Sequence, residues 1–200
     1  MHLTNYLPGL IISYLSGSIP FALIVTYLVS KKDIRKYGSG NVGATNVSRV
    51  IGIKWGRLVF FLDLLKGFLP VIYFPKIFHI NTPIFSILLC LSAISGHNWP
   101  IFLKFKGGKG VSVSIGVLLA FSWVYPQVRL PLTISLLVWV IIFYSFKIVA
   151  IASISCGVCF FVASFIFVKQ LEIKIFALIV ALFIVIRHIK NIKELVSKSN

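Results

Sequence analysis

The chain has 200 residues, of which 58% are hydrophobic, and its mean hydropathy is +1.00. A soluble domain of this composition would expose large apolar patches to water, so the values predict an all-α, polytopic membrane protein. The formal net charge is +16, with 20 Lys and Arg residues against four Asp and Glu. These basic residues lie at the ends of apolar runs, which favours contact with the membrane surface and argues against nucleic acid as a partner.

The first predicted span covers residues 4–29, which is long enough to cross the hydrocarbon core as a helix. Positive charge follows this span at Lys31 and Lys32 and does not precede it, so we expect no signal peptide and an N-terminus outside the membrane. Small residues within the span permit close helix packing, and Pro20 permits a kink.

The basic segment 31–57 follows and contains a run of small and polar residues at 38–46. Its glycines let backbone N–H groups converge on a phosphate, so we interpret this run as an anion-binding loop. It matches neither the P-loop pattern nor the dinucleotide fingerprint. Arg49 adds positive charge near the loop. The candidate phosphate-binding residues are Ser39, Gly40, Asn41, Gly43, Thr45 and Asn46.

The second predicted span, residues 56–78, contains two charged residues, Asp63 and Lys66, on one helix face. Charges within a membrane are costly unless they are paired or face a cavity, so we expect both side chains to face inward. A functional role and a structural ion pair remain open for them. The third span starts at residue 83 and returns to the cytoplasmic side by residue 96.

A second glycine-rich, basic segment follows at residues 96–110. Gly107, Gly108 and Gly110 surround Lys109 directly before a predicted helix over residues 111–124. The N-terminus of a helix favours an anion, and glycines leave the backbone amides accessible to it. The sequence therefore predicts a second phosphate-binding loop.

Residues 130–168 are long enough for two spans turning near Lys147, and a last span covers 171–189. The count is seven spans in a single domain, residues 1–200, with the C-terminus in the cytoplasm. Fifteen of the 20 Lys and Arg residues then lie on the cytoplasmic side, as the positive-inside rule requires. His188 and Asn191 share a helix face at this side, and His188 is a candidate acid or base.

These motifs closely resemble those of the bacterial acyl-phosphate:glycerol-3-phosphate acyltransferases, the PlsY family. The resemblance spans essentially the whole chain and rests on the two loops, on Asp63-Leu-Leu-Lys66-Gly67, on Gly96-His97, and on Arg187-His188 with Asn191. It implies a seven-helix protein of the bacterial inner membrane with its site facing the cytoplasm. It implies transfer of a fatty acyl group from acyl phosphate to glycerol 3-phosphate, which gives lysophosphatidic acid and phosphate in phospholipid synthesis.

The resemblance also implies roles for individual residues. Lys109, His188 and Ser153 are the implied catalytic residues, and the small and polar residues of both loops bind phosphate. Glycerol 3-phosphate is bound by the set Arg49, Lys109, His188 and Asn191. The acyl phosphate is expected from a separate soluble enzyme. No cofactor is implied, and the four scattered acids predict no metal site.

Direct attack by the glycerol 3-phosphate hydroxyl is expected because phosphate is already a competent leaving group, so no covalent acyl-enzyme is needed. The base is either His188 or an oxygen of the substrate's own phosphate. A transporter of an organic phosphate is the alternative from another class, but two similar halves are not found in the sequence. A structural subunit would leave both glycine-rich loops unexplained. The sequence does not indicate the acyl chain preference or the oligomeric state.

Overall fold

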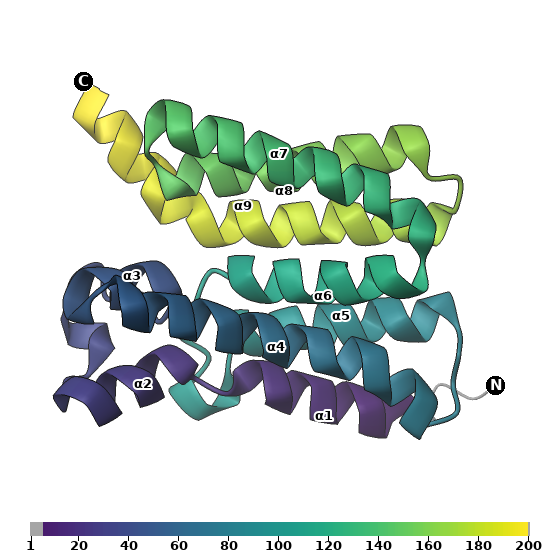
Figure 1. Cartoon of the computed structure of the whole chain (residues 1–200), viewed down its shortest axis with the longest axis horizontal. Coiled ribbons are helices and arrows are strands. Elements are labelled where there is room, and N and C mark those ends of the chain that lie inside the picture. Colours follow the sequence, from purple (N-terminus) through teal and green to yellow (C-terminus); the bar gives the residue numbers. More distant parts are fainter. Residues whose placement is uncertain (1–5, 200) are drawn as a thin grey trace. The chain divides into compact units, whose positions relative to one another are not determined.

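The computed structural model describes residues 6–199, except for the side chains of 194–196, 198 and 199, and its regular elements within that range are all helical. The chain forms two compact units, residues 1–120 and residues 121–200, with the boundary inside helix α6, Val111–Val124 (Figure 1). The prediction of an all-α fold is confirmed for the described residues. Each unit is considered by itself below.

Unit 1 contains α1 (Leu7–Ser18), α2 (Phe21–Ser30), α3 (Ala44–Ile51), α4 (Ile53–Ile77), α5 (Pro83–Asn98) and the first part of α6. The first predicted span is two helices, because the chain breaks at Ile19-Pro20 between α1 and α2. A proline interior to a helix removes a backbone hydrogen bond, which accounts for this break. The kink that Pro20 permits is therefore present.

Helices α1 and α5 approach closely enough for their backbones to touch. A Cβ atom at Gly17 would meet the carbonyl of Ala93, and one at Gly96 would meet the carbonyl of Tyr14. The buried Ser13 hydroxyl also donates to the Leu89 carbonyl at 2.8 Å. Small residues allow this packing in membrane proteins, where apolar burial does not drive helix association.

The segment between α2 and α4 is more ordered than the predicted loop. It contains a 3-10 turn, η2 (Ile34–Lys36), and the helix α3, so Thr45 and Asn46 belong to the first turn of a helix. One face of α3 packs on a small core that includes Val47 and Val59. This helix was not predicted from the sequence, because its first residues are polar and follow three glycines within six positions.

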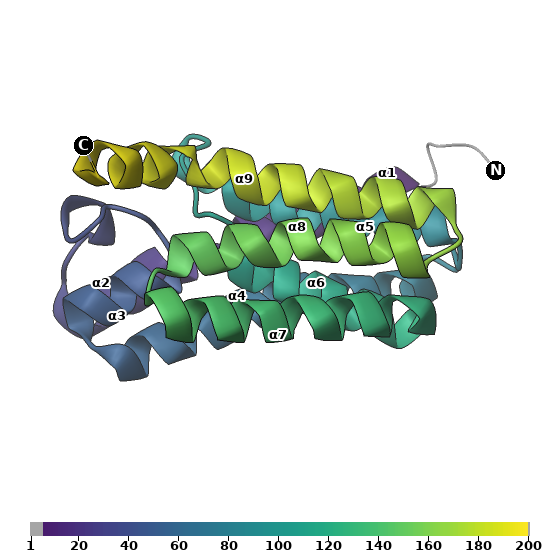
Figure 2. The same ribbon diagram turned by 90° about the horizontal axis from the view of Figure 1, so that it is seen from above.

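Unit 2 contains α7 (Arg129–Phe146), α8 (Val149–Phe167) and α9 (Leu171–Ser199), preceded by the 3-10 turn η4 (Pro126–Val128). Helices α7, α8 and α9 run side by side (Figures 1 and 2). The turn between α7 and α8 lies at Lys147, which has a left-handed backbone, φ 55°, and whose N–H bonds the Phe143 carbonyl. The predicted division of 130–168 at Lys147 is confirmed.

Five segments of the described chain are long and apolar enough to cross a membrane: Leu7–Ser30, Ile53–Ile77, Pro83–Leu103, Pro126–Phe146 and Val149–Phe167. Helix α6 is apolar but shorter, and α9 extends past the predicted end at residue 189. The seven-span count, the sides on which the termini lie and the single domain stay predictions.

Candidate active site

Asn46 determines the shape of the first glycine-rich loop. Its side chain is buried, and its Oδ1 accepts a hydrogen bond from the Ser39 N–H at 2.9 Å. Its Nδ2 donates to the carbonyls of Tyr37, at 3.0 Å, and Ile34, at 3.4 Å. Gly38 has φ +60°, and a Cβ atom there would collide with Asn46 Oδ1. Asn46 therefore holds the backbone of the loop, and its direct contact with phosphate stays a prediction.

The N-terminus of α3 ends this loop and lacks the usual side-chain cap. Gly43 is the N-cap residue, no side chain caps it, and the first turn has no acidic residue. Ser39 and Thr45 are exposed and Asn41 is half-buried. The positive end of a helix that is neutralised by no carboxylate is a suitable place for an anion.

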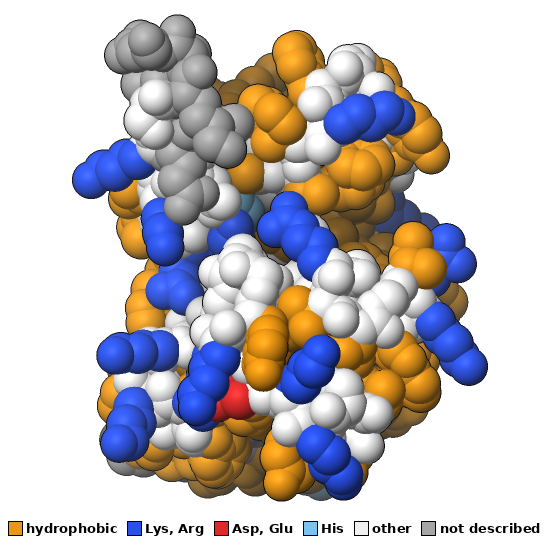
Figure 3. All heavy atoms as spheres, turned by 90° about the vertical axis from the view of Figure 1, so that its left-hand side faces the viewer, with side chains coloured by type: hydrophobic (Ala, Val, Ile, Leu, Met, Phe, Trp, Pro, Cys, Tyr) orange, Lys and Arg blue, Asp and Glu red, His pale blue; other side chains and the backbone are white. Residues whose placement is uncertain are grey.

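Unit 1 is strongly basic around this loop. Lys and Arg side chains lie across the face drawn in Figure 3, and acidic side chains are few there. Asp33 is paired with Arg35 at 2.7 Å, and this hydrogen bond lowers the pKa of Asp33 from 3.8 to about 2. The exposed basic residues of the segment are Lys31, Lys32, Arg35, Lys36, Arg49, Lys54 and Arg57. Their combined potential attracts anionic ligands.

The second glycine-rich loop lies directly on the last turn of α5. The Gly108 N–H donates to the His97 carbonyl at 3.1 Å, and a Cβ atom at Gly107 would meet that same carbonyl oxygen. A Cβ atom at Gly108 would meet His97 Nε2, and one at Gly110, where φ is +77°, would meet the side chain of Asn98. Glycine is required at these positions because a side chain would displace the loop from α5.

Lys109 sits half-buried within this loop, immediately before α6 begins at Val111. The first intrahelical bond joins the Ser114 N–H to the Gly110 carbonyl at 2.8 Å. A glycine loop, a lysine and a helix N-terminus follow one another here, which combines backbone amides, a cation and a helix dipole. The use of Lys109 in phosphate binding and catalysis stays a prediction.

Two residues under this loop were not assigned a role from the sequence, His97 and Asn98. Both are buried, and neither amide atom of Asn98 has a hydrogen-bond partner among the described residues. The sequence showed Gly96-His97 only as a motif, because contacts between distant segments are not visible in it. The spacing of three glycines around Lys109 was the available signal, since such glycines require a close backbone neighbour.

Both glycine-rich loops border one small space in unit 1. It is lined by Val42 of the first loop and Gly108 of the second, together with Asp63, Lys66 and His97. Asp63 is 1% exposed and Lys66 5%, so the prediction that both face inward is confirmed. The structure thus brings the two loops and the intramembrane charges together.

Unit 2 holds the remaining predicted site residues. Ser153 is buried on α8 and accepts a hydrogen bond from Trp139 Nε1 of α7 at 3.4 Å. His188 is buried on α9, and its Nδ1 lies 2.8 Å from the Ile184 carbonyl. A carbonyl only accepts, so Nδ1 carries the proton and Nε2 is the basic nitrogen of the neutral ring. Asn191 is half-buried one turn further along α9.

No cluster of three His, Cys, Asp or Glu side chains that could hold a metal ion exists within the part of the chain that the structure describes. The groups at hand are backbone amides, cations, hydroxyls and imidazoles. They suit the binding of phosphate groups and the movement of a proton.

A family model described as Glycerol-3-phosphate acyltransferase matches residues 7–198. The chain is 41% identical to the glycerol-3-phosphate acyltransferase of Aquifex aeolicus, over 94% of this chain and 93% of the relative. It is 39% identical to that of Staphylococcus aureus, over 93% of this chain and 92% of the relative.

Two crystal structures of PlsY, an integral membrane glycerol 3-phosphate acyltransferase, have the same fold. The glycerol 3-phosphate form gives a TM-score of 0.85 at 40% identity, covering 96% of this chain and 92% of that one. The lysophosphatidic acid form gives 0.83 at 39% identity with the same coverage. Sequence and fold agree over nearly the full length, and the chain therefore belongs to the glycerol-3-phosphate acyltransferase family, PlsY.

Proposed function

We propose that this membrane glycerol-3-phosphate acyltransferase takes its acyl group from acyl phosphate. The primary hydroxyl of glycerol 3-phosphate attacks the acyl carbonyl, the bond from the carbonyl carbon to the phosphate oxygen breaks, and inorganic phosphate leaves. The hydroxyl proton passes to a base, and the product is lysophosphatidic acid. The related crystal structures in glycerol 3-phosphate and lysophosphatidic acid forms support this acceptor and this product.

The observation that carries the proposal is the pair of glycine-rich loops that border one space in unit 1. Acyl phosphate and glycerol 3-phosphate each bring a phosphate group, so a site for both needs more than one anion-binding element. An acyl-CoA donor would not place a phosphate on the acyl carbonyl. Two loops therefore suit a reaction in which one phosphate leaves and the other stays on the product.

Within the first loop and α3 we propose Ser39, Gly40, Asn41, Gly43 and Thr45 for phosphate binding, with Asn46 holding the loop in shape. Exposed Arg49 on α3 serves as a cation for glycerol 3-phosphate. Within the second loop the ammonium of Lys109 and the amides of Gly107 and Gly110 stabilise charge on phosphate, and Gly108, whose own N–H bonds the His97 carbonyl, allows close approach of the backbone. Oriented donors of this kind are worth about 3 kcal/mol each in other enzymes.

His188 is one of two candidate bases, the other being a phosphate oxygen of the substrate. Its Nδ1–H is used by the Ile184 carbonyl, so Nε2 is the nitrogen with a lone pair for a proton. Asn191 follows on the same helix and is proposed for glycerol 3-phosphate. Ser153 is proposed as a further polar site residue; its hydroxyl accepts from Trp139 and retains its own proton to donate.

We further propose seven membrane spans, an N-terminus outside and a cytoplasm-facing site in the bacterial inner membrane. The concentration of Lys and Arg in residues 31–57 and around Lys109 supports that orientation. The acyl phosphate then arrives from a soluble enzyme, because the site faces the compartment in which fatty acids are made.

The experiment that tests the proposal measures lysophosphatidic acid made by the purified protein in lipid from palmitoyl phosphate and glycerol 3-phosphate. Lys109→Ala should lower kcat/KM at least about a hundredfold, as loss of a charge-stabilising donor does elsewhere. Lys76→Ala is the matched control, since Lys76 is an exposed lysine of the same unit in the last turn of α4, at the end opposite to the one that the first loop precedes. Equal activity of the Lys109 variant and the control would contradict the assignment.

The role of His188 has its own test. A His188→Ala variant should lose at least about tenfold in rate if the ring is the base, as general-base catalysis contributes about a hundredfold or more. A smaller loss with unchanged glycerol 3-phosphate affinity would assign the proton to the substrate's phosphate.

A further inference from the structure

Two buried charges lie on α4 next to the glycine-rich loops. Lys66 Nζ is 2.8 Å from Asp63 Oδ1, and His97 Nδ1 of α5 lies 3.7 Å from the same oxygen. All three side chains are at most 6% exposed. Removing a pair of charges from water costs more than their attraction returns in many proteins, so apolar residues would stabilise α4 at least as well. The stability of α4 therefore does not explain why Asp63 and Lys66 are buried there as an ion pair.

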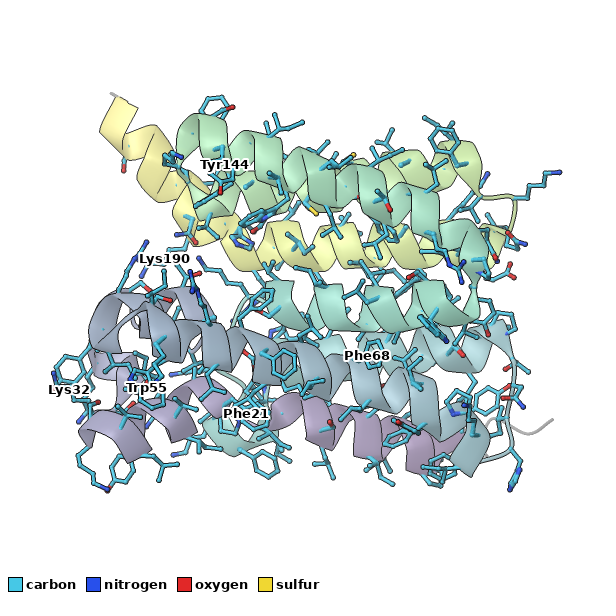
Figure 4. The ribbon with its side chains drawn as sticks, in the orientation of Figure 1. Phe21, Lys32, Trp55, Phe68, Tyr144 and Lys190 are labelled. Carbon is cyan, nitrogen blue, oxygen red and sulfur yellow. The ribbon has the colours of Figure 1, made fainter. Side chains whose placement is uncertain are left out.

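Lys66 connects α4 to the break between α1 and α2. Its Nζ donates to the Ile19 carbonyl at 2.7 Å and lies 5.6 Å from the Phe21 ring, which Figure 4 labels. The Ser16 hydroxyl donates back to the Lys66 carbonyl at 3.1 Å. A break in a membrane helix exposes backbone carbonyls that need a donor inside the protein, and Lys66 supplies it.

His97 connects the same carboxylate to the second glycine-rich loop. Its imidazole lies under Gly108, and its carbonyl accepts the Gly108 N–H. The ring thus has the Asp63 carboxylate 3.7 Å from one nitrogen and the loop backbone at the other. Gly108 has no side chain, so the loop backbone packs directly on the ring. We therefore expect the position of the ring to set the position of the loop.

The helix that follows the second loop is also fixed against α4. A Cβ atom at Gly67 would lie 2.7 Å from the Val113 carbonyl oxygen, and one at Gly116 would meet the Leu64 carbonyl. Helices α4 and α6 therefore touch through their backbones immediately beside Lys66. Val42 of the first loop borders the same space as the charges. The charges thus adjoin both loops at the place where α4 and α6 pack backbone against backbone.

We propose that Asp63, Lys66 and His97 form a positioning cluster that fixes where the two glycine-rich loops lie relative to each other, while Asn46 sets the internal shape of the first loop. The proposal rests on the function proposed above, since it takes the loops to bind the phosphate groups of the substrates. The three residues touch no substrate. Asp63 orients Lys66 and His97, Lys66 holds the break before α2, and His97 supports the second loop.

The test compares three variants in lipid. Asp63→Asn/Lys66→Met removes both charges together, which avoids leaving one charge buried alone and preserves the fold. His97→Gln removes the ring and leaves the backbone carbonyl for Gly108. Ser13→Ala is the matched control, because its buried hydroxyl bonds the Leu89 carbonyl away from the loops. Its loss lowers the unfolding temperature without moving either loop.

The measurements are the KM for glycerol 3-phosphate and the inhibition constant of inorganic phosphate. Neither constant depends on the fraction of folded protein, so a merely structural role does not move them. Both should rise at least tenfold in the Asp63→Asn/Lys66→Met variant, at least fivefold in His97→Gln, and less than twofold in Ser13→Ala.

Unchanged constants in the double variant and in His97→Gln would overturn the positioning role and leave the proposed function intact. If the double variant fails to fold, His97→Gln decides alone. If the wild type makes no lysophosphatidic acid from acyl phosphate, the proposed function fails. Calorimetric titration of inorganic phosphate into the wild type and His97→Gln then still decides the positioning role, with equal affinities overturning it.

Discussion

The two glycine-rich loops are held in place in opposite ways. The first is shaped from within by a side chain, because the Asn46 amide bonds Ser39, Tyr37 and Ile34 of the loop and its approach. The second is shaped from below by another helix, because Gly107 and Gly108 lie on the backbone and ring of His97. The first loop depends on hydrogen bonds, and the second depends on the absence of side chains.

Two loops that are both rich in glycine and basic residues therefore need not tolerate the same substitutions. In the first loop a lost hydrogen bond costs free energy, but the chain has room to relax into solvent. In the second loop an added methyl group meets a packed helix end, which relaxes little. Substitutions in the second loop should therefore have the larger effects.

Gly108→Ala should have the largest effect. Its Cβ atom would meet Nε2 of the buried His97 ring, so either the ring or the loop with Lys109 must move. A misplacement of about 1 Å costs on the order of a hundredfold in rate elsewhere, and we expect a loss of that size in kcat/KM for glycerol 3-phosphate. Steady-state kinetics in lipid measure it.

A second substitution distinguishes a ring contact from a backbone contact. Gly108→Ala/His97→Ala should recover at least about tenfold over Gly108→Ala, because the obstructing ring is gone. Gly107→Ala/His97→Ala should recover nothing, since a Cβ atom at Gly107 meets the His97 carbonyl. Equal recovery in both pairs would contradict a loop that lies on α5 as described.

Asn46→Ala should have an intermediate effect. It removes three hydrogen bonds in a buried position, which costs about 2–3 kcal/mol of the free energy of unfolding. Activity should fall roughly tenfold because the first loop loosens without a steric block. Thermal unfolding and kinetics on the same samples check both values.

Asn46→Asp refines this prediction. The carboxylate still accepts from the Ser39 N–H, but its second oxygen faces the Tyr37 and Ile34 carbonyls, which also only accept, so its defect should be at least as large as that of Asn46→Ala. A variant that is as active as wild type would show that the donated bonds do not hold the loop.

Asp33→Asn should have the smallest effect. The Arg35 pair at the entry to the first loop lowers the pKa of Asp33 to about 2, so its stabilisation is present above pH 4 and is lost as the pH falls towards 2. The pair is exposed and screened, so its contribution is below about 1 kcal/mol. The difference in unfolding temperature between wild type and Asp33→Asn should shrink from pH 6 to pH 2.5. A difference that grows on acidification would contradict the assignment.

The five segments that are long and apolar enough to cross a membrane were predictable from the sequence, because length and apolar composition decide them. The turn at Lys147 follows from the same arithmetic, since residues 130–168 are too long for a single crossing. Helix α3 and the donor that satisfies the break at Ile19-Pro20 were less accessible. The first is short, amphipathic and preceded by glycines, and the second is Lys66, which lies 47 positions away in the chain.

The loops were identifiable as candidate anion-binding elements because glycine, hydroxyl and cation side chains are rare in an apolar chain. Their supports were not identifiable. Asn46 is a residue type that can bind phosphate, but its side chain bonds the backbone of the loop. His97 and Asn98 contact the second loop, and no local sequence pattern predicts those contacts. The residue types of a loop can be seen in the local sequence, but the contacts that hold the loop in place depend on the tertiary structure.

The most direct test of the account measures phosphate released by the wild-type protein in lipid from palmitoyl phosphate, with and without glycerol 3-phosphate, beside palmitoyl-CoA as donor. Phosphate release should require glycerol 3-phosphate and equal the lysophosphatidic acid formed, and palmitoyl-CoA should give no product. Product from palmitoyl-CoA at an equal or greater rate would contradict the central claim that the two loops serve two phosphate-bearing substrates.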